Sequence, residues 1–342
     1  MQPKKKIQQT QPIDIANLLL KNFSNLMLEF YEMQTTFLKS RYNLHKSLET
    51  SNIMINFIKS AHLEIIRQRE KSLDFDISLN NFWNNIQKVS ASPQKIVSIV
   101  DTTGIPKETA RRKIKDLLKK GFLSVDINNK GYSWNLSSKR KDNYYKVATE
   151  DIAAISKFIS YTTKCLGLNL NNKIVRNEIE SQFSFYYYHF LQCELSWLKM
   201  WKTKIKDVDL MFITIQALIP TLKSQDKKIK KDISHDNIHS LIGDGSNYSH
   251  ENAISASSIS EVTGIPRATC IRKLQRLVSL GMLIQESKTR RYFVNQNTSD
   301  RTKHIAKKEN VTFTINAFSE FLSIVINALA RNQKFAPRDL EA

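Results

Sequence analysis

Apolar side chains recur at alternating steps of four and three residues near the start of the chain. The positions concerned are Ile15, Leu19, Phe23, Leu26, Phe30, Met33 and Phe37. This spacing places them on one face of a helix, so it predicts one long amphipathic helix. The same periodicity predicts a second helix over residues 44–69, a break at residues 74–76 and a shorter helix over residues 79–89.

The second half of the chain follows a similar plan. Apolar periodicity there predicts helices over residues 153–166, 175–206 and 209–222. A final helix is indicated by an apolar stripe of Phe318, Leu322, Val325 and Leu329. The polar stretches in between are typical of loops, at residues 223–232 and 243–247.

Two pairs of short segments alternate apolar and polar residues, which is typical of β-strands. Residues 122–127 and 132–136 flank an Asn-Asn-Lys-Gly turn, and residues 283–286 and 291–294 form the second pair. Each pair predicts a two-stranded hairpin. We therefore expect a mainly α fold, with two small β-hairpins flanked by long amphipathic helices.

One segment occurs twice, 160 residues apart, and each copy leads into one of the hairpins. The copies read TGIPKETARRKIKDLLKKGFL at residues 103–123 and TGIPRATCIRKLQRLVSLGML at residues 263–283, with ten of 21 aligned positions identical. A tight turn at glycine followed by a basic amphipathic helix is the pattern of a helix-turn-helix. The match indicates an internal duplication that supplies two such units.

The turns and helix ends of these units carry their own signals. Ser98 and Ser258 each precede an acidic residue by three positions, so we expect each to cap a helix N-terminus in a capping box. Gly104 and Gly264 lie where the chain must turn sharply, and we expect a positive φ at both.

The second helix of each unit has an apolar face. It predicts core positions at Ala110, Ile114, Leu117 and Leu118, and at Cys270, Leu274, Leu277 and Val278. Cys270 replaces Ala110, which favours a small core residue. The alternative is a reactive thiol whose pKa is lowered by the neighbouring Arg272 and Lys273.

The opposite face of each second helix is basic. A helix fits the DNA major groove, where arginine can bind guanine through two hydrogen bonds. We expect base contacts from Lys107, Glu108, Arg111, Arg267, Ala268 and Ile271. We expect mainly phosphate contacts from Thr109, Arg112, Lys113, Thr269, Arg272 and Lys273. The hairpins place further cations for the minor groove or the backbone, namely Lys130, Lys288, Arg290 and Arg291.

The two basic faces are not identical, because Arg111 aligns with Ile271 and Glu108 aligns with Ala268. Isoleucine can touch a thymine methyl group, a role that arginine cannot take. If both helices bind DNA, the two half-sites should therefore differ.

Composition supports a polyanionic partner. The chain has 342 residues with 52 Lys and Arg against 32 Asp and Glu, a net charge of +20. Such an excess favours nucleic acid, although a lysine-rich surface alone would produce it too. The scattered Cys165, Cys193 and Cys270, together with the absence of a secretory signal, favour a reducing cytoplasm. No apolar stretch approaches the ~18 residues of a membrane span.

The repeated segment resembles the winged helix-turn-helix of bacterial transcriptional regulators. TGIPRAT and RKLQRLVSLGML are similar to the DNA-reading segment of IclR-type proteins, and long helices around a hairpin resemble the MarR-type architecture. The resemblance is at superfamily level and covers only the two repeated units. It implies that the hairpins are wings. Because MarR-type chains dimerise through flanking helices, it also implies a single-chain pseudo-dimer, with a homodimer as the alternative.

We expect the chain to divide into four parts. These are a disordered basic arm (residues 1–11), a first helical and winged-helix unit (12–147), a second such unit (148–300) and a C-terminal basic segment and helix (301–342).

The combined interpretation is a sequence-specific regulator of transcription that binds double-stranded DNA with two non-identical helices. One alternative is a plasmid-type replication initiator or architectural DNA-binding protein. Another is a winged-helix scaffold for protein interaction. A regulator that responds to a small-molecule effector is a subtype of the first interpretation, and the sequence does not identify the effector. We expect no membrane partner and no cofactor.

Nothing in the sequence points to an enzyme, since P-loop, GxGxxG, HExxH and GxSxG motifs are absent. His235, His239, His250 and Glu251 lie near one another in sequence, but they lack an obvious fourth ligand, so we expect no metal site. The aromatic-rich residues 183–201 favour a core or a helix–helix interface. A small-ligand pocket is the minority interpretation.

Overall fold

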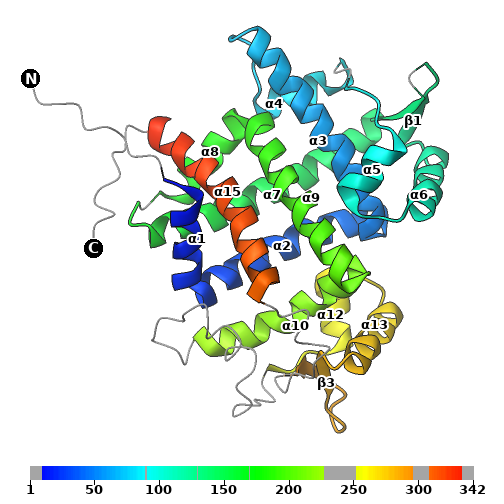
Figure 1. Cartoon of the computed structure of the whole chain (residues 1–342), viewed down its shortest axis with the longest axis vertical. Coiled ribbons are helices and arrows are strands. Elements are labelled where there is room, and N and C mark those ends of the chain that lie inside the picture. Colours follow the sequence, from blue (N-terminus) through cyan, green and yellow to red (C-terminus); the bar gives the residue numbers. More distant parts are fainter. Residues whose placement is uncertain are drawn as a thin grey trace, which may run out of the picture.

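A computed structural model describes residues 10–88, 91–128, 130–168, 170–226, 252–295 and 308–332. These residues form a helical body with two small antiparallel sheets, each of two strands, so the prediction of a mainly α fold is confirmed (Figure 1). Long helices fill the centre, and the two sheets lie at the periphery.

The helices and strands of the first half follow one another in a fixed order. They are α1 (Pro12–Lys21), α2 (Phe23–His45), α3 (Leu48–Lys71), α4 (Leu79–Asn85), the 3-10 helix η1 (Ile86–Lys88), α5 (Ile96–Thr103), α6 (Lys107–Lys119), β1 (Leu123–Asp126), β2 (Gly131–Trp134) and α7 (Ser138–Cys165).

The described part of the second half follows the same order, apart from α4 and η1, whose equivalents lie outside the described residues. Its elements are α8 (Asn172–Ser181), α9 (Phe183–Ile205), α10 (Val208–Asp226), α12 (Ala256–Thr263), α13 (Arg267–Ser279), β3 (Leu283–Gln285), β4 (Tyr292–Val294) and α15 (Lys308–Asn332). The helices α8, α9, α10, α12 and α13 begin 160 residues after α1, α2, α3, α5 and α6. The duplication therefore includes the long helices as well as the repeated segment.

Helices of the two halves pack on one another in reciprocal pairs. α1 packs on α15 as α8 packs on α7, and α3 packs on α9 as α10 packs on α2. Reciprocal contacts of this kind are the mark of a twofold relation between two units. Buried Gln34 of α2 donates a 2.5 Å hydrogen bond to Glu194 of α9, its own equivalent 160 residues on. A residue that contacts its equivalent lies on the axis, so Gln34 and Glu194 mark the pseudo-twofold axis.

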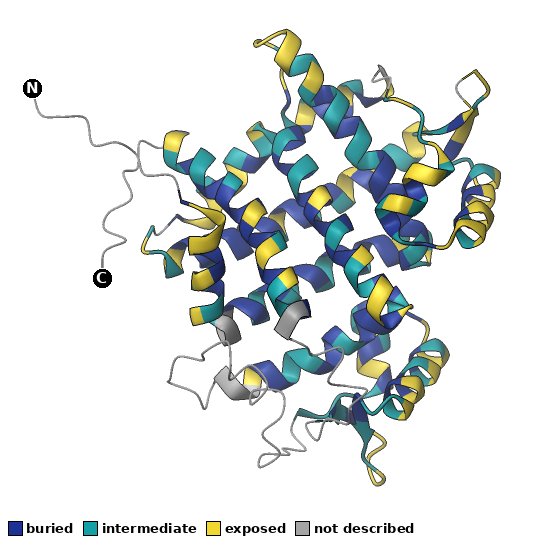
Figure 2. Cartoon of the chain, in the orientation of Figure 1, coloured by how far each residue is buried: buried dark blue, intermediate teal, exposed yellow. Residues whose placement is uncertain are grey.

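Aromatic rings pack around this axis in matched pairs. Phe30 meets Trp197 edge-on at a centroid distance of 5.9 Å, and the equivalent pair of Phe190 and Phe37 meets edge-on at 5.4 Å. All four side chains are buried, and Figure 2 shows the central helices mostly in the buried colour. The aromatic-rich segment is thus part of the core between the halves, as its composition favoured.

Three expectations about helix ends and lengths are wrong. The first long helix is interrupted at Asn22, and the helix expected over residues 175–206 is interrupted at Gln182, the equivalent position. Ser98 and Ser258 lie inside α5 and α12 and cap neither, because these helices begin earlier; the N-cap of α12 is Ser255. Sequence periodicity continues through a one-residue break, so it could not detect the interruptions.

The start of α7 and the apolar character of the last helix also differ from what the sequence predicted. α7 begins at Ser138, well before the expected residue 153, and runs without a break across the boundary placed between residues 147 and 148. Within the described residues, one helix is long and apolar enough to cross a membrane, over Asn310–Arg331, so the expectation that no apolar stretch approaches this length is wrong. This helix packs on α1 and α9, which accounts for its apolar face.

Several expected features lie outside the described residues. These are most of the basic arm, most of the loop at residues 223–232, the loop at residues 243–247, and the four residues weighed as metal ligands, His235, His239, His250 and Glu251.

Candidate functional site

Each half presents the same small module, made of two short helices and a hairpin. We call residues 96–134 the first module and residues 256–294 the second module. Gly104 directly follows α5 with φ 67°, and Gly264 directly follows α12 with φ 74°, so the expected positive φ is confirmed at both turns. Glycine is favoured there because a side chain would strain this left-handed conformation. α6 and α13 begin three residues after these glycines.

Both hairpins have the predicted form. Leu123 pairs with Trp134 in the first module, and Leu283 pairs with Val294 in the second. A third backbone segment extends each sheet through an isolated bridge, to Tyr132 from Gln94 and to Tyr292 from the equivalent Ile254. The hairpins are therefore attached to the chain that precedes α5 and α12.

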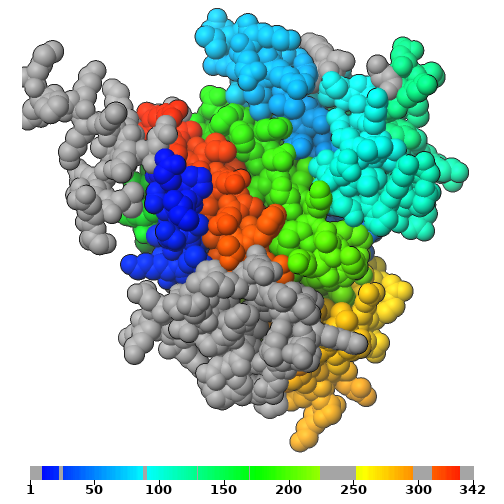
Figure 3. All heavy atoms as spheres, viewed as in Figure 1, coloured from blue at the N-terminus to red at the C-terminus, as the bar shows by residue number. Residues whose placement is uncertain are grey.

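The two modules lie on one side of the molecule. α6 and α13 both lie at the right edge of Figure 1, away from α1 and α8. In the space-filling view their residues form two lobes, one at the right and one at the lower right (Figure 3). The apolar faces of α6 and α13 are buried, and their buried residues are Ala110, Ile114 and Leu117 in α6 and the equivalent Cys270, Leu274 and Leu277 in α13. The opposite faces are therefore presented outward.

Most of the expected DNA-contacting side chains lie on these outward faces. The exposed residues are Lys107, Glu108, Arg111, Arg112, Arg267, Ala268 and Arg272. Thr109, Thr269 and Ile271 are half-buried at the edges of the same faces. The cations of the hairpins are exposed as well, at Lys130, Lys288, Arg290 and Arg291.

The outward faces of α6 and α13 differ in how their arginines are held. Arg111 donates a 2.6 Å hydrogen bond to Glu108, and both side chains are more than half exposed. In α13 these positions carry Ile271 and Ala268, and Arg267 instead donates to Ser257 at 2.9 Å. One helix thus presents an ion pair where the other presents an apolar patch.

Lys113 and Lys273 are the exceptions among the expected phosphate contacts. Their side chains are only 16% and 12% exposed, and both turn toward the helical body. The ammonium group of Lys113 lies 3.2 Å from Glu49, and that of Lys273 lies 2.6 Å from Asp207. The structure therefore gives both lysines carboxylate partners within the chain, in place of the outward position that the helical pattern implied.

Sequence reasoning missed these carboxylates, Glu49, Asp207 and Asp209. A signal for them existed, because Ser47-Leu48-Glu49 and Asp207-Val208-Asp209 occupy equivalent positions at the same 160-residue offset. Both segments pair a capping side chain with an acid two residues later, at the start of α3 and α10. The repeated segment alone did not reach far enough to include them.

The two modules differ in polarity at their outer edges. The exposed Val97, Val125 and Ile127 of the first module align with Ser257, Gln285 and Ser287 of the second. The second hairpin carries three exposed cations near its turn, whereas the described turn residues of the first carry Lys130. The first module is therefore more apolar at its outer edge, and the second more basic.

The alternative of a reactive thiol at Cys270 is not supported. Cys270 is fully buried, and its thiol donates to the carbonyl oxygen of Ile265 at 3.4 Å. Burial raises the pKa of this thiol, and the opposing effects of Thr263 and Lys273 are smaller. Cys270 is a small core residue, as its alignment with Ala110 favoured.

A groove of about 340 Å³ lies between α9 and α15. His189, Cys193, Phe313 and Glu320 are among the residues that line it. It lies on the helical body and includes none of the residues expected to contact DNA.

Comparison with known proteins adds no assignment. No protein-family model matches the chain, and neither a curated protein nor a solved structure matches it. The geometry of the two modules is therefore the basis for assigning a function.

Proposed function

We propose that the chain is a sequence-specific DNA-binding regulator of transcription, with two winged helix-turn-helix units in one chain. α6 and α13 would enter successive major grooves, and the hairpins would act as wings on the backbone or minor groove. The chain would bind as a pseudo-dimer, because the helices of its two halves pack on one another in reciprocal pairs about a pseudo-twofold axis. Occupancy of the DNA site would be the regulatory event.

The observation that carries this proposal is the pair of exposed basic helices at equivalent positions. Arg112 and Arg272 occupy the same position on α6 and α13, and both are exposed. Both helices lie at one edge of the molecule (Figure 2). Both copies keep this cation, although the neighbouring outward position has diverged to Arg111 in one copy and Ile271 in the other. A net charge of +20 further favours a polyanionic partner.

The deciding experiment is a selection from random DNA duplexes with the full chain, followed by anisotropy titrations of the enriched duplex over a salt series. We expect a two-part site with unlike halves. The affinity should fall steeply with salt, because each phosphate contact contributes about 0.9 to the slope of log affinity against log salt.

The matched variants are Arg112→Ala with Arg272→Ala, against Lys21→Ala with Lys173→Ala. The second pair removes the same charge from exposed positions at the ends of α1 and α8, far from the modules. The arginine variant should lose affinity and lower the salt slope by about 2, whereas the lysine variant should keep the slope. If both pairs of substitutions lowered the affinity and the salt slope equally, the arginines of α6 and α13 would contribute only through the net charge of the chain.

Other outcomes identify the alternative functions. A steep salt slope without an enriched sequence would favour an architectural protein, and a footprint over direct repeats would favour a replication initiator. Absence of duplex binding at physiological salt would contradict the proposal. It would leave the interaction scaffold, which the exposed Val97, Val125 and Ile127 of the first module favour.

A further inference from the structure

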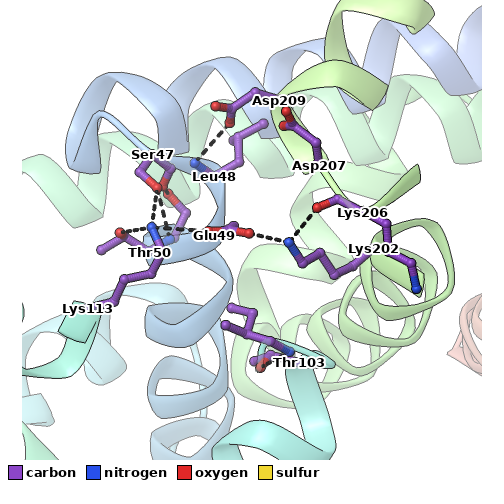
Figure 4. Close-up of polar contacts among 12 residues, drawn as sticks. Ser47, Leu48, Glu49, Thr50, Thr103, Lys113, Lys202, Lys206, Asp207 and Asp209 are labelled. Carbon is purple, nitrogen blue, oxygen red and sulfur yellow. Dashed lines mark hydrogen bonds and ion pairs between the residues drawn. The ribbon is translucent and has the colours of Figure 1, made fainter. Parts of the chain in front are cut away.

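Lys113 is tied to the second half of the chain through Glu49. Glu49 lies in the first turn of α3, and its Oε2 faces Lys113 of α6 at 3.2 Å. Its other oxygen, Oε1, accepts a hydrogen bond from Lys202 of α9, which belongs to the second half (Figure 4). Lys202 also donates to the carbonyl oxygen of Lys206 at 2.6 Å. One carboxylate thus joins α6 to a long helix of the opposite half.

Asp209 makes the converse connection. Its Oδ2 lies 3.6 Å from Lys273 of α13, and its Oδ1 accepts from the backbone N–H of Leu48 at 3.4 Å. Leu48 is the first residue of α3, in the first half. Asp207 supports this arrangement, because it binds Lys273 at 2.6 Å and accepts from the N–H of Leu210 at 3.1 Å.

The two connections meet at the first turn of α3. Leu48 binds Asp209, and the next residue, Glu49, binds Lys113. Ser47 caps the same turn by accepting from the N–H of Thr50. A helix N-terminus favours carboxylates, because its free N–H groups carry partial positive charge. A continuous chain of polar contacts therefore runs from α6 to α13 through a single helical turn.

This network is shielded and balanced in charge. Its three cations, Lys113, Lys202 and Lys273, have side chains between 10% and 16% exposed, and its three carboxylates are between 23% and 25% exposed. Burial raises the pKa of Glu49, but Lys202 and Lys113 outweigh it, and the pKa lies below its ordinary value. Removing one lysine would leave a shielded carboxylate short of a partner, which costs more than breaking a surface pair.

We propose that Glu49 and Asp209 couple the positions of α6 and α13, so that releasing one helix from the body loosens the other. Lys113 and Lys273 are then positioning residues, not phosphate contacts. Only the purpose of the coupling rests on the proposed function: it would fix the separation of two DNA-binding helices. The coupling itself is a property of the free chain.

The test is hydrogen–deuterium exchange of the full chain without DNA. Lys113→Met keeps the length of the side chain and removes its charge. We expect amide exchange to rise at least about fivefold in α6 and also in α13, and Lys273→Met should do the same in reverse, because coupling is reciprocal. Lys115→Met, an exposed charge on the same helix, is the control and should leave α13 unchanged.

Glu49→Gln is the second variant, which decides the question if Lys113→Met does not fold. It keeps the shape of the side chain and removes the charge that Lys113 and Lys202 share. Faster exchange in both helices supports the coupling, whereas a rise confined to α6 in either variant overturns it.

Titration of a selected duplex separates this proposal from the proposed function. Lys113→Met should weaken binding to both half-sites, whereas Arg112→Ala should weaken mainly one. If the chain binds no duplex, the proposed function fails while the exchange experiment still decides the coupling.

Discussion

The two halves of the molecule share the same arrangement of helices, but equivalent positions carry side chains of different polarity. In one place, buried Arg41 of α2 pairs with Asp151 of α7 at 2.6 Å, and Tyr187 of α9 donates to the same carboxylate. The equivalent positions of the other half carry Trp201, Val311 and Met27. The same arrangement of helices therefore accommodates either an ion pair or apolar residues at these positions, which agrees with the small net benefit of buried ion pairs over apolar residues.

The largest expected effect comes from breaking this ion pair on one side only. Arg41→Met leaves the buried Asp151 with the Tyr187 hydroxyl but without its counterion, so we expect a loss of about 3–5 kcal/mol in the free energy of unfolding, measured by urea titration. Adding Asp151→Val introduces the residue of the equivalent position, Val311, and removes the uncompensated buried charge, so it should restore much of that loss. A double variant less stable than Arg41→Met would show that the halves differ in more than these side chains.

The axis pair Gln34 and Glu194 gives a second way to separate the halves. Apart from their 2.5 Å hydrogen bond, one buried oxygen of each has no hydrogen-bond partner among the described residues, namely Oε1 of Gln34 and Oε2 of Glu194. Burial raises the pKa of Glu194 to about 8 from its ordinary value of 4.5, despite the opposing effect of Gln34. A proton on Oε2 would let the neutral acid donate to the free oxygen of Gln34.

Stability linked to this proton is fully present below about pH 4.5 and is lost as the pH rises through about 8. Glu194→Gln should remove that loss. We expect the variant to be more stable than the original chain at pH 9, on the order of 5 kcal/mol, and no more stable at pH 4. Urea titrations across this range measure the difference. Glu70→Gln, at an exposed site on α3, is the control, and an equal pH profile in both variants would contradict the assignment.

The outward faces of the modules provide a third, smaller effect. Ala268→Glu with Ile271→Arg gives α13 the ion pair of α6. On the proposed function, selection from random duplexes should then return two like half-sites, with each altered base contact worth about 1–3 kcal/mol. Glu108→Ala with Arg111→Ile is the reciprocal exchange. An unchanged selected sequence would exclude these positions from base recognition.

The smallest effect tests how closely the modules match. Gly104→Ala and Gly264→Ala each place a side chain at positive φ, so each should cost about 1–2 kcal/mol in a urea titration. The new Cβ would lie 3.2 Å from Cγ of Lys199 at the first site and would press on the side chain of Asn43 at the second. Both neighbours can move aside, so the two losses should be similar. If Asn43→Gly rescued Gly264→Ala, the clash rather than φ would be the cause.

Features that depend on near neighbours in the chain were predicted well. The hairpin around residues 128–131 and the buried face of α6 both follow from alternation and helical spacing. The interruptions at Asn22 and Gln182 were missed, because the apolar stripe continues through them. The position of Ser98 inside α5 shows that a capping pattern three residues long does not fix where a helix begins.

The sequence by itself determined the duplication, the two modules and the residues that lie on their outward faces. These follow from side-chain order along the chain, which sets what a helix or a hairpin can bury. Only the tertiary structure decided that Lys113 and Lys273 face carboxylates, because Lys113 and Glu49 lie more than 60 residues apart and meet only when α6 packs on α3. The axis pair of Gln34 and Glu194 was likewise fixed by how α2 crosses α9, a choice made by packing of the whole core.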